Sequence, residues 1–377
     1  MSTSYWLDES APALPRAQKS TRPNAVVVGG GVTGFACALA LTQGGMRVHL
    51  HEAREIASGA SGRNGGFALR GGAMPYDEAR RQLGRDAAIG LWRLTERYLE
   101  RLAELAGDAF RAVGSLRLAA DAAERHELRA EYDALREDGF DADWLDELPP
   151  ALAGRFPGAI RNPGDGALQP ARWVRRLAGL AVEAGADVRE RSRVDSLGDL
   201  DAAHVVIATD GYSEGLLPEL QTAVQATRGQ VVATEPLPEL LFPCPHYARH
   251  GFDYWQQLPD GRLVVGGRRD TTLEAEYSTV EETTEAIQTQ IEELVRELLG
   301  RLPRITHRWA GLFGTTADRL PLVGPVPGRD GVWVAAGYSG HGNVMGLACG
   351  ELVARAILGE PAPELSLFDP GRAALAR

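Results

Sequence analysis

The stretch that decides the fold is VVVGGGVTGFACALALTQGGMRVHLHEAREIASGASGRNGGF, residues 26–67. A run of β-branched residues leads into Gly29, Gly31 and Gly34, which have the spacing G-x-G-x-x-G. Between a strand and a helix, the first glycine permits a tight turn, the second lets backbone N–H groups approach a pyrophosphate, and the third allows close packing. The stretch therefore predicts a dinucleotide-binding unit whose helix, about residues 32–44, directs its N-terminus at the phosphates.

Three glycines alone are not specific, because the chain holds 44 glycines in 377 residues. The surroundings make the pattern specific: Gly44 and Gly45 close the helix, and residues 46–50 predict a second strand that ends near Glu52. A carboxylate at this distance accepts hydrogen bonds from the ribose hydroxyls of an adenine nucleotide. We therefore expect Glu52 to bind the nucleotide; the alternative is a solvated strand end.

The next segment, residues 57–66 (ASGASGRNGG), contains too many small residues to form a packed helix. Small residues permit close approach of the backbone to a ligand, and Arg63 and Asn64 supply hydrogen-bond donors. Such a loop suits a cofactor that extends beyond its pyrophosphate, as FAD does. Here the sequence resembles the FAD-dependent amine and amino-acid oxidoreductases, the family of D-amino-acid, glycine and sarcosine oxidases. GASGRNGG resembles the γ-glutamylputrescine oxidase branch most.

Composition excludes several classes of protein. A net charge of -11 and a pI near 5.3 argue against a nucleic-acid surface. No segment approaches about 18 consecutive apolar residues, so we expect no membrane span. Cys37, Cys244 and Cys349 have no metal-ligand spacing, which predicts no metal site and favours a reducing, cytoplasmic location. The length and hydrophobic content suit two domains.

Residues 1–24 lack the basic and apolar regions of a secretory signal. Tyr5 and Trp6, together with residues 12–16, resemble the start of the γ-glutamylputrescine oxidase branch, in which an arm precedes the nucleotide strand. We expect the aromatic pair to dock on the body of the protein. A disordered arm is the alternative.

The remaining pattern predicts an α/β fold with an α+β second domain. Apolar spacing over residues 77–106 predicts one long amphipathic helix. Further helices are expected over 122–136, 170–184 and 280–299, and strands over 113–119, 204–211, 228–236, 253–267 as a hairpin, and 332–336. The resemblance implies a discontinuous Rossmann-like FAD-binding domain of glutathione-reductase type (25–75, 150–222 and 305–377) after an N-terminal arm (1–24). A mixed antiparallel-sheet substrate-binding or cap domain takes up 76–149 and 223–304.

In the resembling family, a strand ending A-T-G or A-T-N lies beside the cofactor, and an earlier strand meets the adenine. Here the first strand ends at residues 208–211 (ATDG), and the second is expected around residues 193–194. Asp210 stands where many relatives have glycine, and we assign it no role. Gly211 is expected to allow close backbone approach.

A second loop, residues 337–343 (GYSGHGN), connects a predicted strand to a helix that begins near Asn343. The resemblance implies that this helix N-terminus meets the flavin near N1 and the C2 carbonyl, where negative charge accumulates on reduction. Fixed donors and a helix dipole stabilise such an anion. His341 is a possible catalytic base, or it positions the loop backbone.

One position separates this chain from the amino-acid oxidases. Those enzymes read G-L-R-P-G-T-x-D, and the arginine holds the substrate α-carboxylate. Residues 311–318 read GLFGTTAD, so Phe313 replaces that arginine. A buried unpaired carboxylate costs several kcal/mol. We therefore expect an amine without a nearby carboxylate, unless Arg268 or Arg269 substitutes from another strand.

Three further expectations follow from the resemblance. Tyr254 and Trp255 come from a sheet that walls the substrate pocket in the family; cross-strand packing is the alternative. Gly311 occupies the register of the cysteine that tethers flavin in sarcosine oxidases, so the FAD should be non-covalent. Lys19 is the only lysine, and its place in the arm makes a lysine above the flavin unexpected. The electron acceptor, O2 or another, stays open.

The predicted reaction is oxidation of a neutral amine by hydride transfer to flavin N5, giving an imine and then an aldehyde plus an amine or ammonia. One rival is an oxidoreductase for D-amino acids, glycine, sarcosine or 2-hydroxy acids, which requires the arginine pair Arg268 and Arg269 to face the ring. A remote rival is a non-catalytic flavin-binding protein. Predicted substrate-pocket residues are His341, Tyr254, Trp255 and Phe313. Predicted cofactor-binding residues are Gly29, Gly31, Val32, Thr33, Gly34, Glu52, Ala53, Ser61, Gly62, Arg63, Asn64, Gly65, Gly66, Val194, Ala208, Thr209, Gly211, Gly337, Ser339, Gly340, His341, Gly342 and Asn343.

Overall fold

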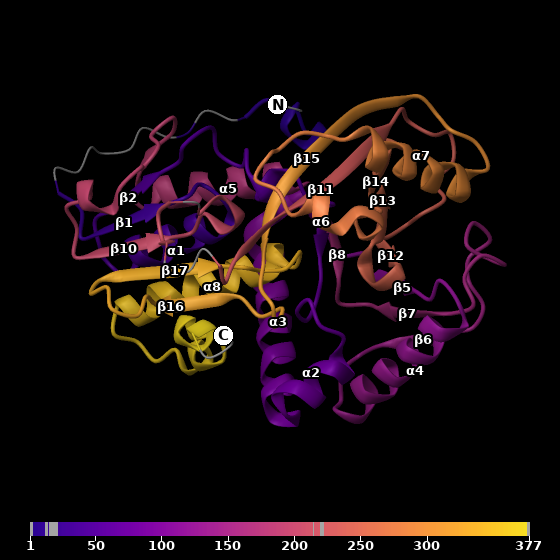
Figure 1. Cartoon of the computed structure of the whole chain (residues 1–377), viewed down its shortest axis with the longest axis horizontal. Helices are drawn as coiled ribbons and strands as arrows, with labels where there is room; N and C mark the ends of the chain where they lie inside the picture. The colour runs from indigo at the N-terminus through magenta and orange to yellow at the C-terminus, as the bar shows by residue number, and fades with distance from the viewer. Residues whose placement is uncertain (1–2, 12–13, 15–21, 214, 219–221, 375–377) are drawn as a thin grey trace.

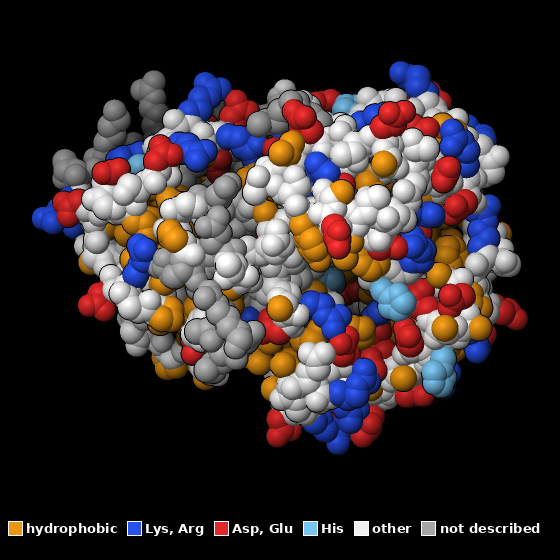
Figure 2. Space-filling view, in the orientation of Figure 1, with side chains coloured by type: hydrophobic (Ala, Val, Ile, Leu, Met, Phe, Trp, Pro, Cys, Tyr) orange, Lys and Arg blue, Asp and Glu red, His pale blue; other side chains and the backbone are white. Residues whose placement is uncertain are grey.

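The computed structural model describes residues 3–11, 14, 22–213, 215–218 and 222–374. Two sheets stand side by side, with the long helix α3 (Arg85–Ala106) between them in Figure 1. Acidic and basic side chains are interspersed over the face drawn in Figure 2. Among the described helices, none is long and apolar enough to cross a bilayer.

The first sheet contains the predicted nucleotide strand at its centre. Its strands are parallel except β16, which pairs antiparallel with β17 at the edge. In spatial order they are β16 (Leu322–Pro325), β17 (Val332–Ala336), β10 (His204–Ile207), β1 (Ala25–Val28), β2 (Val48–His51) and β9 (Asp187–Arg189). Every residue of β1 is buried, as expected of a strand covered on both faces.

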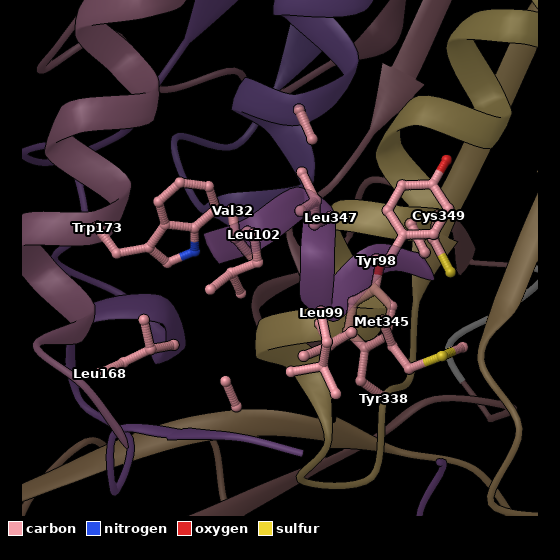
Figure 3. Packing of buried hydrophobic residues seen from close by; sticks show 14 of the residues in the cluster. Val32, Tyr98, Leu99, Leu102, Leu168, Trp173, Tyr338, Met345, Leu347 and Cys349 are labelled. Carbon is pink, nitrogen blue, oxygen red and sulfur yellow. The ribbon is translucent and has the colours of Figure 1, made fainter. Parts of the chain in front are cut away.

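Helices α1 (Val32–Gln43), α5 (Pro170–Glu183) and α8 (Gly342–Ile357) pack together on one face of this sheet. Two glycines make the packing close: a Cβ at Gly34 would overlap the carbonyl oxygen of Gly29, and a Cβ at Gly350 would overlap that of Thr33. Figure 3 shows the apolar cluster between these helices and α3. Its labelled members are Val32, Tyr98, Leu99, Leu102, Leu168, Trp173, Tyr338, Met345, Leu347 and Cys349.

The second sheet has eight strands and mixed pairing, with β12 and β5 parallel. In spatial order they are β15 (Ile305–Thr315), β11 (Gln225–Thr234), β14 (Leu263–Gly267), β13 (Asp253–Gln257), β12 (His246–Ala248), β5 (Ser115–Leu118), β7 (Ala159–Asn162) and β6 (Asp143–Leu145). Helix α7 (Glu285–Leu299) covers one apolar face of the sheet. The long pair β11 and β15 arches from the first sheet into the second (Figure 1).

A small antiparallel sheet joins β3 (Phe67–Ala68), β8 (Gly166–Leu168) and β4 (Phe110–Arg111). The α/β fold with a Rossmann-like domain and a second, mixed-sheet domain is therefore confirmed. The domain boundaries stay a prediction. Strands β7 and β15 belong to the eight-stranded sheet, although the boundaries expected from sequence place both in the FAD-binding domain.

Three sequence expectations are corrected. The helix expected over residues 77–106 is two helices, α2 (Tyr76–Leu83) and α3, because Gly84 adopts a φ of 87° between them. Helix α7 begins at Glu285 rather than at residue 280. Residues 193–194 form no strand: Arg191 has a left-handed φ of 52°, which ends the ladder after β9. Helix α4 (Ala122–Glu137) matches expectation.

The aromatic pair of the N-terminal arm docks as predicted. Trp6 is completely buried, and its indole Nε1 donates a hydrogen bond to the carbonyl oxygen of Asn64 at 2.8 Å. Tyr5 lies against the His307 ring. Residues 12–13 and 15–16 of the expected branch signature, and Lys19, lie outside the described residues.

Candidate active site

The glycine turn after β1 forms a cradle that side chains cannot enter. Gly29 has a φ of 114°, and a Cβ on it would lie 2.5 Å from the carbonyl oxygen of Ala208 on the neighbouring strand end. A Cβ on Gly31 would lie 2.8 Å from the Ser61 hydroxyl. The first turn of α1 follows directly, and a helix N-terminus leaves backbone N–H groups without intrahelical partners. The cradle therefore presents backbone amides to an anion.

Glu52 stands at the end of β2 and faces this turn. Its Oε2 accepts a hydrogen bond from the Gly30 backbone N–H at 2.7 Å, and its Oε1 accepts one from the Arg54 N–H at 2.8 Å. The carboxylate thus lies where the sequence predicted it, beside the glycine turn. Its contact with a ribose stays a prediction. The neighbouring residues 191 and 192 donate backbone hydrogen bonds to the chain around Glu52, so they run alongside without forming a strand.

The two loops chosen separately from the sequence meet each other. The Asn64 side chain donates a hydrogen bond to the Asn343 Oδ1 at 3.3 Å, and the Asn343 Nδ2 returns one at 3.2 Å. Ser61 accepts a hydrogen bond from the Val32 N–H at 3.1 Å, which joins residues 57–66 to the start of α1. The structure therefore brings the glycine turn, the second glycine-rich loop and the N-terminus of α8 to one place.

Arg63 holds this loop in position from within the protein. Its side chain is 5% exposed, and Nε donates to the Ser58 carbonyl at 2.7 Å while Nη1 donates to the Ala310 carbonyl at 3.1 Å. Nε also lies 3.4 Å from Oε1 of Glu281. Because these bonds occupy the guanidinium inside the protein, Arg63 anchors the loop, and the cofactor contact predicted for it stays a prediction.

Glu281 was not among the residues predicted for the site. Its Oε2 lies 2.6 Å from Arg54, and its Oε1 accepts a hydrogen bond from the Tyr212 hydroxyl. Together with its ion pair to Arg63, these contacts tie the segment before α7 to the cofactor loop. A lone acidic residue in a charged stretch carries no sequence signal for such a role.

Asp210, left without a role above, clamps three chain segments. Its Oδ1 accepts a hydrogen bond from the Gly337 N–H at 2.7 Å, and its Oδ2 accepts one from the Gly314 N–H at 2.8 Å. Burial raises the pKa of the carboxyl group, and the backbone N–H groups of Gly314 and Gly337 oppose that shift. A Cβ on the next residue, Gly211, would lie 2.8 Å from the Phe313 backbone. The end of β10 thereby fixes both β15 and residues 337–343.

The ring of Phe313 lies beside glycines of two different segments. A Cβ on Gly340 would lie 4.0 Å from that ring, and one on Gly229 would lie 3.4 Å from the ring and 3.9 Å from the Tyr254 hydroxyl. Tyr254 also packs against Gly65 of the cofactor loop. Phe313 thus lies near residues 337–343 and Tyr254 near residues 57–66, and their contact with a substrate stays a prediction. The Tyr254 hydroxyl has no hydrogen bond within the described residues.

Trp255 points to the opposite face of the sheet. It is completely buried with the α7 core, and its ring stacks on His246 at 5.4 Å between ring centres. Successive side chains of a strand face opposite ways, so Tyr254 and Trp255 cannot line the same pocket. The substrate role predicted for Trp255 has no support from its position, and cross-strand packing describes it.

His341 precedes α8 and lies in the loop at the site. Burial lowers its pKa to about 4, and the positive charge of Arg269 contributes to the shift. Its Nδ1 has no hydrogen-bond partner among the described residues. A histidine with this pKa is neutral near pH 7 and is a weak base.

The two adjacent arginines have different surroundings. Arg268 pairs with Asp253 at 2.9 Å and with Glu297 at 2.8 Å. Arg269 forms no ion pair or hydrogen bond within the part of the chain that the structure describes. Its guanidinium lies over the rings of Phe252 and Phe313, at 4.6 and 5.5 Å from their centres.

A separate cleft lies beside Asp210 and is lined by residues of β11 and β17 and of the segment between β10 and β11, together with Thr279. Among its described lining residues, Asp210 carries the charge, and both of its oxygens accept backbone hydrogen bonds. Its lining includes Gly211, Leu217, Val224, Ala226, Val334 and Ala336.

A mostly parallel sheet, a glycine turn at its centre and two converging loops indicate a dinucleotide-binding protein. The match to a family model makes this specific: residues 24–356 match the DAO family, FAD dependent oxidoreductase, and the chain belongs to this family. It is accordingly an FAD-dependent oxidoreductase that acts on amine or amino-acid donors. The cradle around Gly31 and the convergent backbone donors fit FAD. Across the described residues, no group of histidine, cysteine, aspartate and glutamate side chains could hold a metal ion.

Several relatives span nearly the whole chain. A probable oxidoreductase OrdL of Rhizobium meliloti is 30% identical over 95% of this chain and 88% of its own length. The gamma-glutamylputrescine oxidoreductase of Escherichia coli is 28% identical over 89% of this chain and 83% of its own length. Among solved structures, the glycine oxidase of Geobacillus kaustophilus is 24% identical and has a TM-score of 0.76 over 93% of this chain and 98% of that one. The fold is therefore that of the glycine oxidases.

Proposed function

We propose that this chain oxidises a small primary or secondary amine, with γ-glutamylputrescine-like amines as the first substrates to test. The products are an imine and, after hydrolysis, an aldehyde plus an amine or ammonia. A relative named for gamma-glutamylputrescine, 28% identical, supports the choice of substrate. The resemblance of residues 59–66 to the same branch supports it as well.

The observation that carries the proposal is the position of Phe313. Its ring lies beside Gly229 and Gly340, and the Tyr254 hydroxyl lies close to Gly229 as well. An apolar aromatic surface between the two cofactor loops suits the hydrocarbon part of an amine. The same surface cannot neutralise a carboxylate by itself.

Bound FAD supplies the redox chemistry by accepting a hydride from the substrate. The residues of this chain orient the substrate and provide electrostatic stabilisation at the site. Phe313 and Tyr254 orient the substrate and keep water from its apolar part. Asp210 fixes the backbone of Gly337, and the N-terminus of α8 directs its dipole toward the site.

In this proposal the solvent, and not a side chain of the site, removes the proton of the alkylammonium ion. The pKa of His341 is lowered to about 4 by burial, which makes it too weak a base to deprotonate an alkylammonium ion efficiently. The amine therefore arrives neutral, and the rate rises with pH toward the pKa of the amine. A flat profile of kcat/KM between roughly pH 7 and roughly pH 10 would contradict this.

Two further features belong to the proposal. The FAD is non-covalent, because Gly311 occupies the register of the tethering cysteine and the described cysteines are buried free thiols. A cytoplasmic location agrees with the same free thiols. Oxygen and other electron acceptors are both compatible with the site.

The test is an anaerobic visible spectrum of the purified flavoprotein. The flavin band is followed while γ-glutamylputrescine, putrescine, sarcosine, glycine and D-alanine are added, and air is then admitted. Bleaching by an amine supports the proposal; fast recovery in air identifies an oxidase and slow recovery a dehydrogenase. Bleaching by D-alanine or glycine alone would refute the amine assignment. Absence of a yellow cofactor would contradict the site described above.

A further inference from the structure

Arg269 lies in the candidate substrate site and forms no ion pair or hydrogen bond with the described residues. It follows the end of β14, and its guanidinium lies between the rings of Phe252 and Phe313. Asp270 and Glu276 act on its charge from a distance, but each forms its ion pair with another arginine: Asp270 with Arg249, and Glu276 with Arg228. The adjacent Arg268 is held by Asp253 and Glu297.

Partly buried cations cost free energy unless they are paired or hydrogen-bonded. Two aromatic rings offset part of this cost, because a cation over a ring face is attracted by its quadrupole. They leave the guanidinium N–H donors unused. A planar guanidinium presents these donors in a fork that matches a carboxylate.

A second polar group lies near the same ring. The Tyr254 hydroxyl has no hydrogen bond within the described residues, and a Cβ on Gly229 would lie 3.9 Å from it and 3.4 Å from the Phe313 ring. Burial raises the pKa of Tyr254, and Arg269 opposes the shift. The Arg269 guanidinium and the Tyr254 hydroxyl beside one apolar ring suit a ligand with both an apolar part and an anionic part.

We propose that Arg269 binds a carboxylate of the substrate, so the preferred substrates are amines that also carry a carboxylate. This inference rests on the proposed function and narrows its substrate class. The guanidinium lies beyond the Phe313 ring, 5.5 Å from its centre, and does not replace that side chain. The recognised carboxylate is therefore held from the segment after β14, whereas the arginine of the amino-acid oxidases corresponds to position 313 in β15.

The first experiment measures binding without turnover. Acetate, butyrate and benzoate are titrated into the FAD-loaded protein, and the shift of the flavin visible band gives Kd. Arg269→Gln should raise Kd about tenfold or more, the range of a lost charge-assisted hydrogen bond. Arg269→Lys should recover part of the affinity, because it keeps the charge and loses the fork. Arg268→Gln is the matched control and should leave Kd unchanged.

The second experiment compares substrate pairs matched in chain length that differ in the carboxylate: β-alanine with propylamine, γ-aminobutyrate with butylamine, δ-aminovalerate with pentylamine, and γ-glutamylputrescine with N-(4-aminobutanoyl)putrescine. In the wild type, the carboxylate member of at least one pair should have the higher kcat/KM by about tenfold or more. Arg269→Gln should abolish the preference mainly through KM. Thermal unfolding of each variant checks that folding is retained.

The outcomes separate this inference from the proposed function. If amines reduce the flavin but paired substrates react equally, or if Arg269→Gln retains the preference, the inference fails and amine oxidation stands. If Arg269→Gln lowers only thermal stability and leaves the Kd of carboxylates unchanged, Arg269 is a packing residue and the inference also fails. If no amine reduces the flavin, the proposed function fails, and the carboxylate titration alone decides the role of Arg269.

Discussion

The guanidinium carbon of Arg269 lies 5.5 Å from the centre of the Phe313 ring. These residues come from β15 and from the segment after β14, which are not neighbours in the sheet, since β11 separates them. The sequence shows only that an aromatic residue stands at 313. In the structure the Arg269 guanidinium lies over that ring. The site therefore contains a positive charge although residue 313 is phenylalanine and not arginine.

Replacement of Phe313 by leucine tests whether the ring supports the cation. Leucine keeps the apolar surface but removes one of the two rings beneath Arg269, a contact worth about 0.5 to 1 kcal/mol at exposed sites and more when desolvated. We expect the Kd of benzoate and butyrate, measured by flavin absorbance, to rise about two- to fivefold. An unchanged Kd for both carboxylates would show that the ring does not hold the guanidinium in place.

A methyl group at Gly31 should weaken cofactor binding. The added Cβ would lie 2.8 Å from the Ser61 hydroxyl, which accepts a hydrogen bond from the Val32 N–H. The two loops must then separate, so Gly31→Ala should lose FAD on gel filtration. Gly90→Ala is the control: it lies in α3 with open space around it, and should keep FAD and gain up to about 1 kcal/mol. If Gly31→Ala retained as much FAD as Gly90→Ala, the turn around Gly31 would not be the binding site of FAD.

Glu281→Gln should destabilise the protein and loosen its flavin. The carboxylate is 8% exposed and contacts Arg54, Arg63 and Tyr212. Removal of one partner from a buried ion pair costs about 3 to 5 kcal/mol. Urea unfolding should show a loss of this order, together with faster FAD release, because Arg63 anchors the cofactor loop.

Glu282→Gln is the matched control for that experiment. Glu282 is the neighbouring residue and is exposed, so its free energy of unfolding should change by less than about 0.5 kcal/mol. Stability equal to the wild type in Glu281→Gln would mean that the network does not hold the two parts of the site together.

Asp210→Asn should cost about 1 to 3 kcal/mol, because an amide has one acceptor oxygen where the carboxylate offers two. Either the Gly314 or the Gly337 N–H then faces an amide nitrogen. Asp330→Asn, an exposed position, is the control for chemical unfolding. Because Gly337 begins the loop at the site, the asparagine variant should also raise KM. If Asp210→Asn had the same free energy of unfolding as Asp330→Asn, the two hydrogen bonds of Asp210 would not stabilise the fold.

Local patterns predicted much of this molecule, and the rest depends on contacts distant in the sequence. The glycine turn, α1, β10 and α8 follow from glycine spacing and apolar runs, and their positions agree with expectation. The spacing of apolar residues predicted one continuous helix, but the chain forms two helices separated at Gly84. The φ of 87° at this glycine cannot be inferred from the apolar spacing. The roles of Glu281 and Asp210 depend on their hydrogen-bond and ion-pair partners on other elements, and only the structure distinguishes Arg269 from the paired Arg268. Trp255 was assigned to the pocket although strand alternation places it opposite Tyr254.

A buried histidine outside the site should make stability depend on pH. His246 is 1% exposed and stacks on Trp255, and burial lowers its pKa to about 4. The ordinary value near 6.5 applies to the unfolded chain. Between these values the unfolded state binds the proton and the folded state does not, so the free energy of unfolding falls as the pH is lowered from about 6.5 to about 4.

The size of this contribution is at most about 3 kcal/mol, from a pKa difference of about 2.5 units. His246→Phe keeps an aromatic ring on Trp255 and removes the titrating group. Urea unfolding at several pH values should therefore show a shallower loss of stability in this variant than in the wild type below about pH 6.5. His126→Phe, at an exposed helix position, should leave the wild-type slope unchanged. If His246→Phe keeps the full slope, acid lability arises from other groups, and His246 is protonated without opening the core.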